Sequence, residues 1–194
     1  MPSHKIHLSI AQEINKKLKL DNDAIMLGSV LPDLTIEHNH ELSHFQFEDV
    51  YPKNLANADE FIKKYPNMKD DISIGYIIHL LTDKYYNDVY YHTNIDGIEH
   101  NKNFKHNLFD CYDSYLLKHG IVKNINDKNV INKIPNYKDI NFDKKYLIEY
   151  IDKLNSDIKN ANIDKSYNIE HLDFLNSLYK NCINFINQEI NKYR

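Results

Sequence analysis

Two histidine–aspartate pairs are the strongest chemical signal in the sequence. His79 and Asp83 lie within the segment HLLTD, and His106 and Asp110 lie within HNLFD. A spacing of four residues places both side chains of a pair on the same face of a helix, one turn apart. Imidazole nitrogen and carboxylate oxygen are ligands that zinc takes in proteins. The two pairs therefore predict metal binding on two consecutive helices.

The surroundings of each pair leave a second interpretation open. The segment around His79 is apolar on every side, so we expect it to be buried on all faces. A buried, ionised Asp83 needs a cation or a dense set of donors, although a neutral histidine bonded to it in a helical core is the alternative. For His106 and Asp110, with Asp113 nearby, the alternative is a solvated helix face. An antiparallel hairpin of the two helices would direct both pairs at one point, as in helical-bundle metal sites.

Most of the other histidines lie in the same part of the chain. Ten of the eleven fall between positions 4 and 119. His7 lies on the apolar stripe of the first expected helix, where a histidine is also common as a core residue. Asp33 directly follows Pro32 and precedes His44, so its carboxylate is expected to face whatever the following loop encloses. His38 and His40 are flanked by glutamates, and we expect them at the surface.

The rest of the sequence predicts helices that would position these residues. Four glycines and five prolines are too few for a loop-rich β fold. Apolar spacing predicts one all-α, bundle-like domain over residues 1–194, with the metal-site portion at about 1–118 and the C-terminal helices at about 142–192 completing it. We expect residues 31–53 to be irregular and 120–141 to form a long connection. The expected helices span about 3–20, 21–30, 54–65, 70–92, 100–118, 142–160 and 167–192.

Composition excludes several classes of function. The net charge is −4, with 24 basic and 28 acidic residues, so the sequence predicts no stable nucleic-acid complex. No run approaches the roughly 18 apolar residues of a membrane-spanning helix. The N-terminal segment lacks the unbroken apolar stretch of a secretory signal, and we expect a cytoplasmic protein. Cys111 and Cys182 form no CxxC pair and are interpreted as core residues rather than chemical groups.

The order of the motifs over residues 1–115 resembles the zinc-dependent phospholipase C family, which is similar to the zinc-dependent P1-type nucleases. No single motif is specific, and the resemblance rests on their joint order and spacing. The motifs are His7-x-x-Ile10-Ala11, Gly28-Ser-Val-Leu-Pro-Asp33, Ser43-His44-Phe45, Gly75-Tyr-Ile-Ile-His79-Leu-Leu-Thr-Asp83 and His106-x-x-x-Asp110.

The resemblance implies an all-helical domain that holds two or three zinc ions in a cleft. One zinc would be bound by Asp33, His44, His79 and Asp83, and Asp83 would bridge to a second zinc bound by His7. A third zinc would be bound by His106, Asp110 and one further histidine, for which His92 is favoured slightly over His100. The implied reaction is hydrolysis of a phosphodiester, in either a phospholipid or a soluble phosphate ester. Asp33 would orient or deprotonate the attacking water.

Three departures from the family pattern bear on this interpretation. Secreted members bind metal through an N-terminal Trp, whereas this chain has none, so the amine of Pro2 or the side chain of His4 would have to replace it. Asp110 stands where the family usually has Glu. No lipid-binding domain follows the helical part, and residues 120–194 match no part of the family.

The phosphoesterase interpretation has two rival functions. The first is a non-catalytic helical protein that is stabilised by metal. The second is a phosphohydrolase of the HD type, which needs an adjacent His-Asp pair, and no histidine here is directly followed by aspartate.

Overall fold

The computed structural model describes residues 2–36, 39–46, 55–92, 102–160 and 172–193, with side chains throughout except at 90–92 and 102–108. These residues form helices and short 3-10 turns without a single strand, which confirms the predicted all-α class. None of the described helices combines the length and the apolar character required to cross a membrane.

The helix boundaries agree closely with the apolar periodicity. The long helices are α1 (His4–Leu18), α5 (Asp71–His92), α6 (Lys102–Lys118), α7 (Lys144–Lys159) and α8 (Leu172–Glu189). Shorter helices are α2 (Asn22–Gly28), α3 (His40–Ser43) and α4 (Ala58–Lys64), and 3-10 turns are η1 (Leu31–Asp33), η2 (Lys128–Lys133) and η3 (Ile190–Lys192). Of these, α3 and η1 lie in the segment predicted to be irregular, and η2 lies in the predicted long connection.

Side-chain caps explain where several helices begin. The hydroxyl of Ser3 accepts a hydrogen bond from the backbone amide of Ile6 at 3.3 Å, as the sequence predicts. Asp21, Asn57 and Asp143 cap α2, α4 and α7 in the same way. Each cap satisfies amides that would otherwise have no partner in the first helical turn. Four helix starts are therefore encoded locally.

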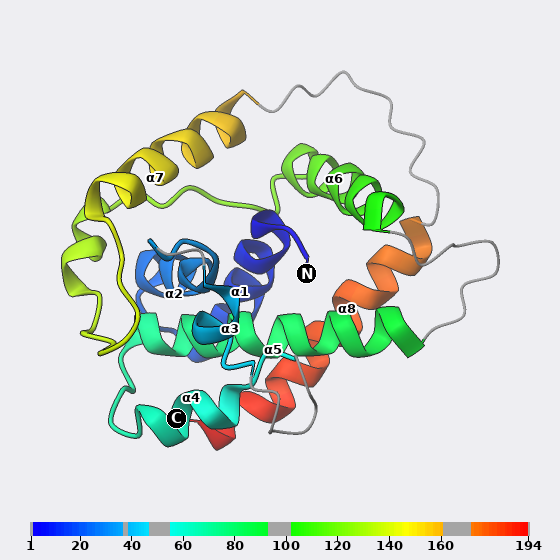
Figure 1. Cartoon of the computed structure of the whole chain (residues 1–194). Coiled ribbons are helices and arrows are strands. Elements are labelled where there is room, and N and C mark those ends of the chain that lie inside the picture. The colour runs from blue at the N-terminus through cyan, green and yellow to red at the C-terminus, as the bar shows by residue number, and fades with distance from the viewer. Residues whose placement is uncertain (1, 37–38, 47–54, 93–101, 161–171, 194) are drawn as a thin grey trace.

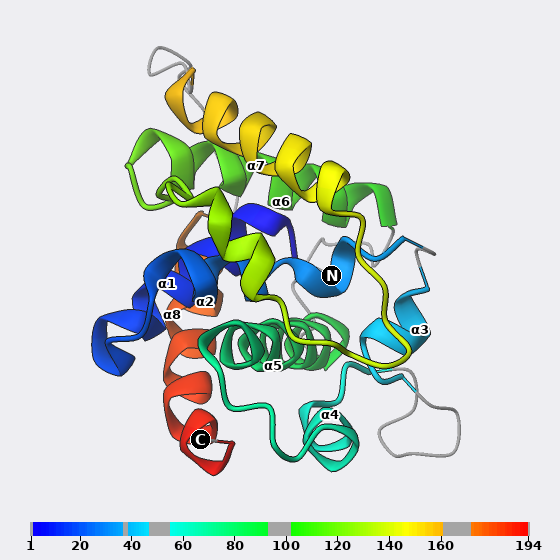
Figure 2. The same ribbon diagram turned by 90° about the vertical axis from the view of Figure 1, so that its left-hand side faces the viewer.

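Helix α5 lies at the centre of the molecule. Figure 1 shows it running across the middle of the fold, and Figure 2 shows it almost end-on, with other helices around it. It packs against α1, α2, α4 and α8. Tyr76, Ile77, Ile78, Leu80 and Leu81 are at most 1% exposed, which confirms that this stretch is buried on every side. Residues on any face of α5 can therefore reach a neighbouring element.

Helices α2 and α5 cross in direct backbone contact at two glycines. A Cβ atom at Gly28 would lie 2.1 Å from the carbonyl oxygen of Ile72, and one at Gly75 would lie 2.3 Å from that of Ile25. Both distances are far below van der Waals contact, so only glycine permits this approach. The crossing brings the chain after α2, which includes Ser29 and Asp33, against the histidine-bearing part of α5.

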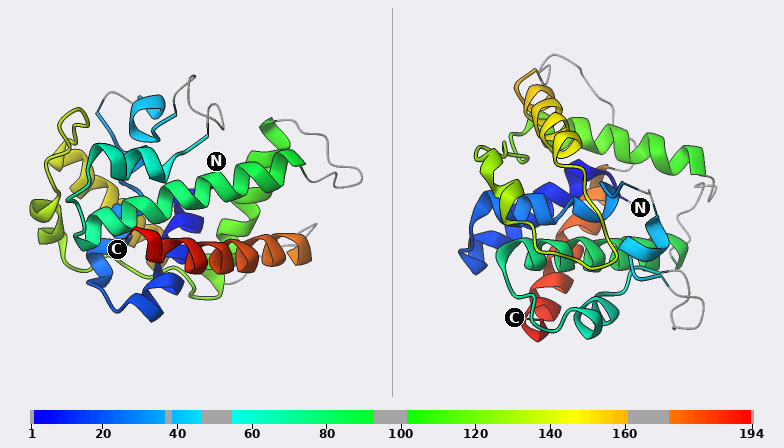
Figure 3. Two further views of the ribbon diagram at one scale, coloured as in Figure 1. Left: turned by 90° about the horizontal axis from the view of Figure 1, so that it is seen from below. Right: turned by 60° about the vertical axis from the view of Figure 1, so that its left-hand side comes forward.

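The pairing of α5 with α6 differs from the expected hairpin. In the described residues α6 packs mainly against α1. Its contact with α5 includes the rings of Tyr86 and Phe109, whose centroids are 5.8 Å apart. The start of α1 lies between the two helices, with α6 and α7 on the same side of α5 (Figures 2 and 3). Sequence proximity favoured α5 and α6 as direct partners, whereas the apolar stripe of α1 occupies that position.

Candidate metal centre

Five side chains that the sequence predicts as ligands lie together in the middle of the fold. His79 and Asp83 come from α5, His7 from α1 and Asp33 from η1. His44 directly follows α3 as its C-terminal cap. Four of them are fully buried, and the side chain of Asp33 is only 7% exposed. The structure thus brings residues from four different elements to one point.

The distances between their polar atoms match those of metal ligands. His44 Nε2 lies 3.3 Å from Asp33 Oδ1 and 3.3 Å from Asp83 Oδ2. His7 Nε2 lies 3.3 Å from Asp83 Oδ1, and His79 Nε2 lies 3.6 Å from Asp83 Oδ2. Two nitrogen or oxygen ligands at the usual zinc distance and the tetrahedral angle are about 3.3 Å apart. The spacing of the donors therefore fits a divalent cation.

Backbone carbonyls fix the orientation of two of the imidazole rings. The Nδ1–H of His79 donates to the carbonyl oxygen of Ser29 at 2.8 Å, and the Nδ1–H of His44 donates to that of His40 at 3.0 Å. Their Nε2 atoms, which face each other at 3.0 Å, are therefore the ones left to hold a metal. Two lone pairs at this distance repel each other unless a proton or a metal ion lies between them. Hydrogen bonding of the other ring nitrogen is typical of metal-binding histidines.

Several polar atoms of the cluster have no hydrogen-bond partner. These atoms are both carboxylate oxygens of Asp83, Oδ1 of Asp33 and both ring nitrogens of His7. The His7 ring stacks on the His79 ring with centroids 3.9 Å apart. Buried carboxylate oxygens without donors are strongly unfavourable, and a bound cation would satisfy them. The donor set therefore suits zinc, which binds histidine nitrogen and carboxylate oxygen together.

The donors form two adjoining groups that differ in exposure. His7, His79 and Asp83 form the inner group, which is fully buried. Asp33, His40 and His44 form the outer group, in which the His40 side chain is 50% exposed. Zinc sites that catalyse reactions keep a position open to water, whereas structural sites are closed. The inner group has the character of a closed site and the outer group that of an open one.

Two further histidines lie at the exposed rim, next to Asp33. His4 Nε2 lies 3.3 Å from Asp33 Oδ2, and His40 Nδ1 lies 3.7 Å from Asp33 Oδ1. His4 was one of the two candidates to replace the missing Trp, and the structure places it at the cluster. His40 is at the surface, as predicted, but no pattern in the sequence indicates that its ring reaches Asp33. The short helix α3 is responsible, because it turns His40 and His44 toward the same carboxylate.

Burial and charge shift the pKa values within the cluster. Burial lowers the pKa of His7 to about 4, helped by the nearby His79, so this ring is neutral at pH 7. Burial alone would raise the pKa of Asp83, but the charge of His79 and the close imidazoles of His44 and His7 hold it well below its usual range. For His44, burial lowers the pKa, but the carboxylates of Asp33 and Asp83 outweigh it and raise the value to about 9. In the metal-free protein, His44 is thus protonated and positively charged at pH 7.

Zinc binding is therefore expected to release about one proton per chain near pH 7. The ion must displace the proton of His44, so zinc affinity should rise about tenfold per pH unit and level off above pH 9. Titration calorimetry at pH 7 in two buffers with different ionisation enthalpies measures this release. Equal binding heats in the two buffers would contradict it.

The residues predicted for a third metal are only partly described. Asp110 is exposed and belongs to neither donor group. The side chains of His92 and His106, and the whole of His38 and His100, lie outside the described residues. The nearby Asp113 is buried and accepts a hydrogen bond from the Ser3 hydroxyl, and burial raises its pKa to about 6. The third site stays a prediction.

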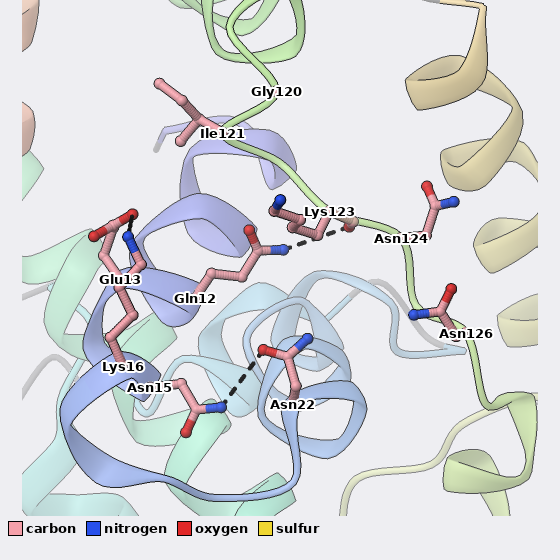
Figure 4. A pocket seen from close by; sticks show the side chains of 10 residues that line it. All are labelled: Gln12, Glu13, Asn15, Lys16, Asn22, Gly120, Ile121, Lys123, Asn124 and Asn126. Atoms are coloured by element: carbon pink, nitrogen blue, oxygen red, sulfur yellow. Dashed lines mark hydrogen bonds and ion pairs between the residues drawn. The ribbon is translucent and has the colours of Figure 1, made fainter.

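Two cavities lie near α1. One, of about 580 Å³, lies between α1, α2 and residues 120–126 and is shown in Figure 4. Amide and charged side chains line it, among them Gln12 and Asn22, and it contains no histidine. The other, of about 450 Å³, lies between α1 and α7 and is lined in part by His4. Only the second therefore shares a residue with the rim of the metal centre.

Comparison with known proteins yielded no relative. No protein-family model, no curated protein and no solved structure matches the chain. The interpretation of the centre therefore depends on its own geometry and on the motif resemblance.

Proposed function

We propose that this protein is a metal-dependent hydrolase of phosphate esters that binds zinc through the described histidine–aspartate cluster. The supporting observation is that both oxygens of Asp83 and Oδ1 of Asp33 are buried without a hydrogen bond, beside the facing Nε2 atoms of His44 and His79. These donors come from the residues that the phospholipase C resemblance assigns to the first two zinc ions. The proposal assigns one ion to each of the two donor groups.

The side chains have separate tasks in this proposal. His7, His79 and Asp83 hold the inner ion and, being fully buried, exclude water from it. His44 and Asp33 hold the outer ion. Asp33 also faces the exposed His4 and His40, so its carboxylate can orient a water molecule and accept its proton. Bound zinc ions would lower the pKa of that water and stabilise charge on the phosphoryl oxygens.

A non-catalytic, metal-stabilised protein is the second candidate function. Full burial of the inner group favours it for the inner ion, because closed zinc sites are typically structural. The half-exposed His40 and His4 of the rim favour the hydrolase for the outer ion. The two candidates therefore differ in what the outer group does.

Replacement of Asp33 by asparagine separates the two candidates. We expect Asp33→Asn to retain the inner zinc but to hydrolyse bis(p-nitrophenyl) phosphate at least about 100-fold more slowly than the wild type, because it lacks the carboxylate that accepts the proton. Zinc content and hydrolysis rate are measured on the same samples. A wild type that holds zinc but does not hydrolyse phosphate esters would support the structural candidate, and an undiminished rate in the variant would exclude the proposed role of Asp33.

A further inference from the structure

The cavity between α1 and α7 adjoins the rim of the metal centre at His4. His4 belongs to both, because its Nε2 lies 3.3 Å from Asp33 Oδ2 while its ring contacts that of Tyr150 edge-on, with centroids 5.3 Å apart. The volume of the cavity, about 450 Å³, is within the range of small-molecule sites. A ligand in this cavity would therefore lie beside the outer donor group.

Among the described residues, the Tyr150 hydroxyl has no hydrogen-bond partner. Its phenolic oxygen is buried and bonds to no described residue. Burial raises the pKa of Tyr150, and its ring contacts that of His4, which in turn lies 3.3 Å from Asp33. The hydroxyl thus stays protonated and can donate to an acceptor on a ligand. An unsatisfied buried hydroxyl is costly, so an acceptor atom of a ligand that reached it would stabilise the bound state.

The lining of the cavity also indicates what kind of molecule fits. One face of α7 supplies Tyr146, Tyr150, Lys153 and Asp157, and α1 adds Lys5 beside His4. The lining thus contains both positively and negatively charged side chains and two tyrosine rings. Leu154 is its aliphatic residue. Acyl chains of a lipid would meet charged groups here, whereas a polar organic group would meet donors, acceptors and ring faces.

We propose that this cavity holds the organic group of a water-soluble phosphate ester, and that the Tyr150 hydroxyl donates a hydrogen bond to its phosphoryl group beside Asp33. This inference rests on the proposed hydrolase function and specifies its substrate class. It also gives α7, which lies outside the part of the chain that resembles the phospholipase C family, a role in binding the substrate.

Binding of inorganic phosphate to the zinc-loaded chain tests the hydroxyl without relying on turnover. We expect Tyr150→Phe to bind phosphate about tenfold more weakly than the wild type in titration calorimetry, with unchanged zinc content, because one hydrogen bond to an anion is lost. Tyr193→Phe is the matched control, since its hydroxyl bonds to Asp59 and not to any residue of the cavity. Equal phosphate affinity of wild type and Tyr150→Phe, with zinc retained, would overturn the inference and leave the proposed function standing.

The substrate class is tested with two sources of the same phosphodiester chemistry. We expect zinc-loaded wild type to hydrolyse bis(p-nitrophenyl) phosphate and to leave phosphatidylcholine vesicles intact, with Tyr150→Phe at least about tenfold slower on the soluble ester. Faster hydrolysis of the vesicles would overturn the soluble class. A wild type that binds no zinc would overturn both the proposed function and this inference.

Discussion

Replacement of Asp83 by alanine is expected to lower zinc affinity by more than 100-fold and to remove the stabilisation that we expect zinc to give the folded chain. Asp83 belongs to the inner group and faces His7 through one carboxylate oxygen and both His79 and the outer group's His44 through the other, so it contacts both donor groups. At a zinc concentration 1,000 times the dissociation constant, binding stabilises the folded state by about 4 kcal/mol. Thermal unfolding with and without zinc measures this difference.

The control for this experiment is Asp88→Ala. Asp88 lies five residues further along α5 and is half-buried, but it belongs to neither donor group. Its replacement should leave the zinc-dependent rise in melting temperature unchanged. A full zinc-dependent rise in Asp83→Ala would show that the cluster does not bind the ion that stabilises the protein.

The second large effect is expected from Gly75→Ala, although alanine normally stabilises a helix. A Cβ atom at position 75 would lie 2.3 Å from the Ile25 carbonyl oxygen, so α2 and α5 must move apart. We expect a loss of about 3 kcal/mol in the free energy of unfolding, at the upper end of overpacking effects. Zinc affinity should fall as well, because the separation moves the Ser29 carbonyl away from Nδ1 of His79.

Gly120→Ala is the matched substitution for this prediction. No atom lies within 4 Å of the position of a new Cβ there, but Gly120 has a φ angle of 61°. The substitution should therefore cost about 1 kcal/mol through backbone strain alone, without any change in zinc affinity. Denaturant unfolding and zinc titration of both variants provide the comparison. A Gly75→Ala variant as stable as the wild type would contradict the close crossing.

The sequence predicted those parts of the fold and centre that depend on local pattern. Apolar periodicity and capping residues located the helices, since both act within a few residues of chain. His79 and Asp83 were recognisable because a carboxylate on an apolar helix needs a charged partner. The motif resemblance then assigned His7, Asp33 and His44, which the structure places with them.

What the sequence could not provide are contacts between distant segments. The Ser29 carbonyl can accept the hydrogen bond from His79 only because α2 and α5 cross closely at their glycines. His40 reaches Asp33 only because of α3, a four-residue helix without a strong apolar pattern. The placement of α6 against α1 depends on which apolar stripes pack best, which spacing alone does not determine. The cavity between α1 and α7 could not be predicted from the sequence either. It depends on the position of Tyr150 beside His4, which is distant in the sequence.

The most direct test of the metal centre is the zinc content of the untagged wild-type chain, measured by plasma mass spectrometry after exhaustive dialysis. The two donor groups predict about two zinc ions per chain, and a filled third site would raise this number to three. A protein that retains no zinc after loading and dialysis would contradict the account. The buried carboxylates of Asp33 and Asp83 would then be balanced by protonated histidines alone.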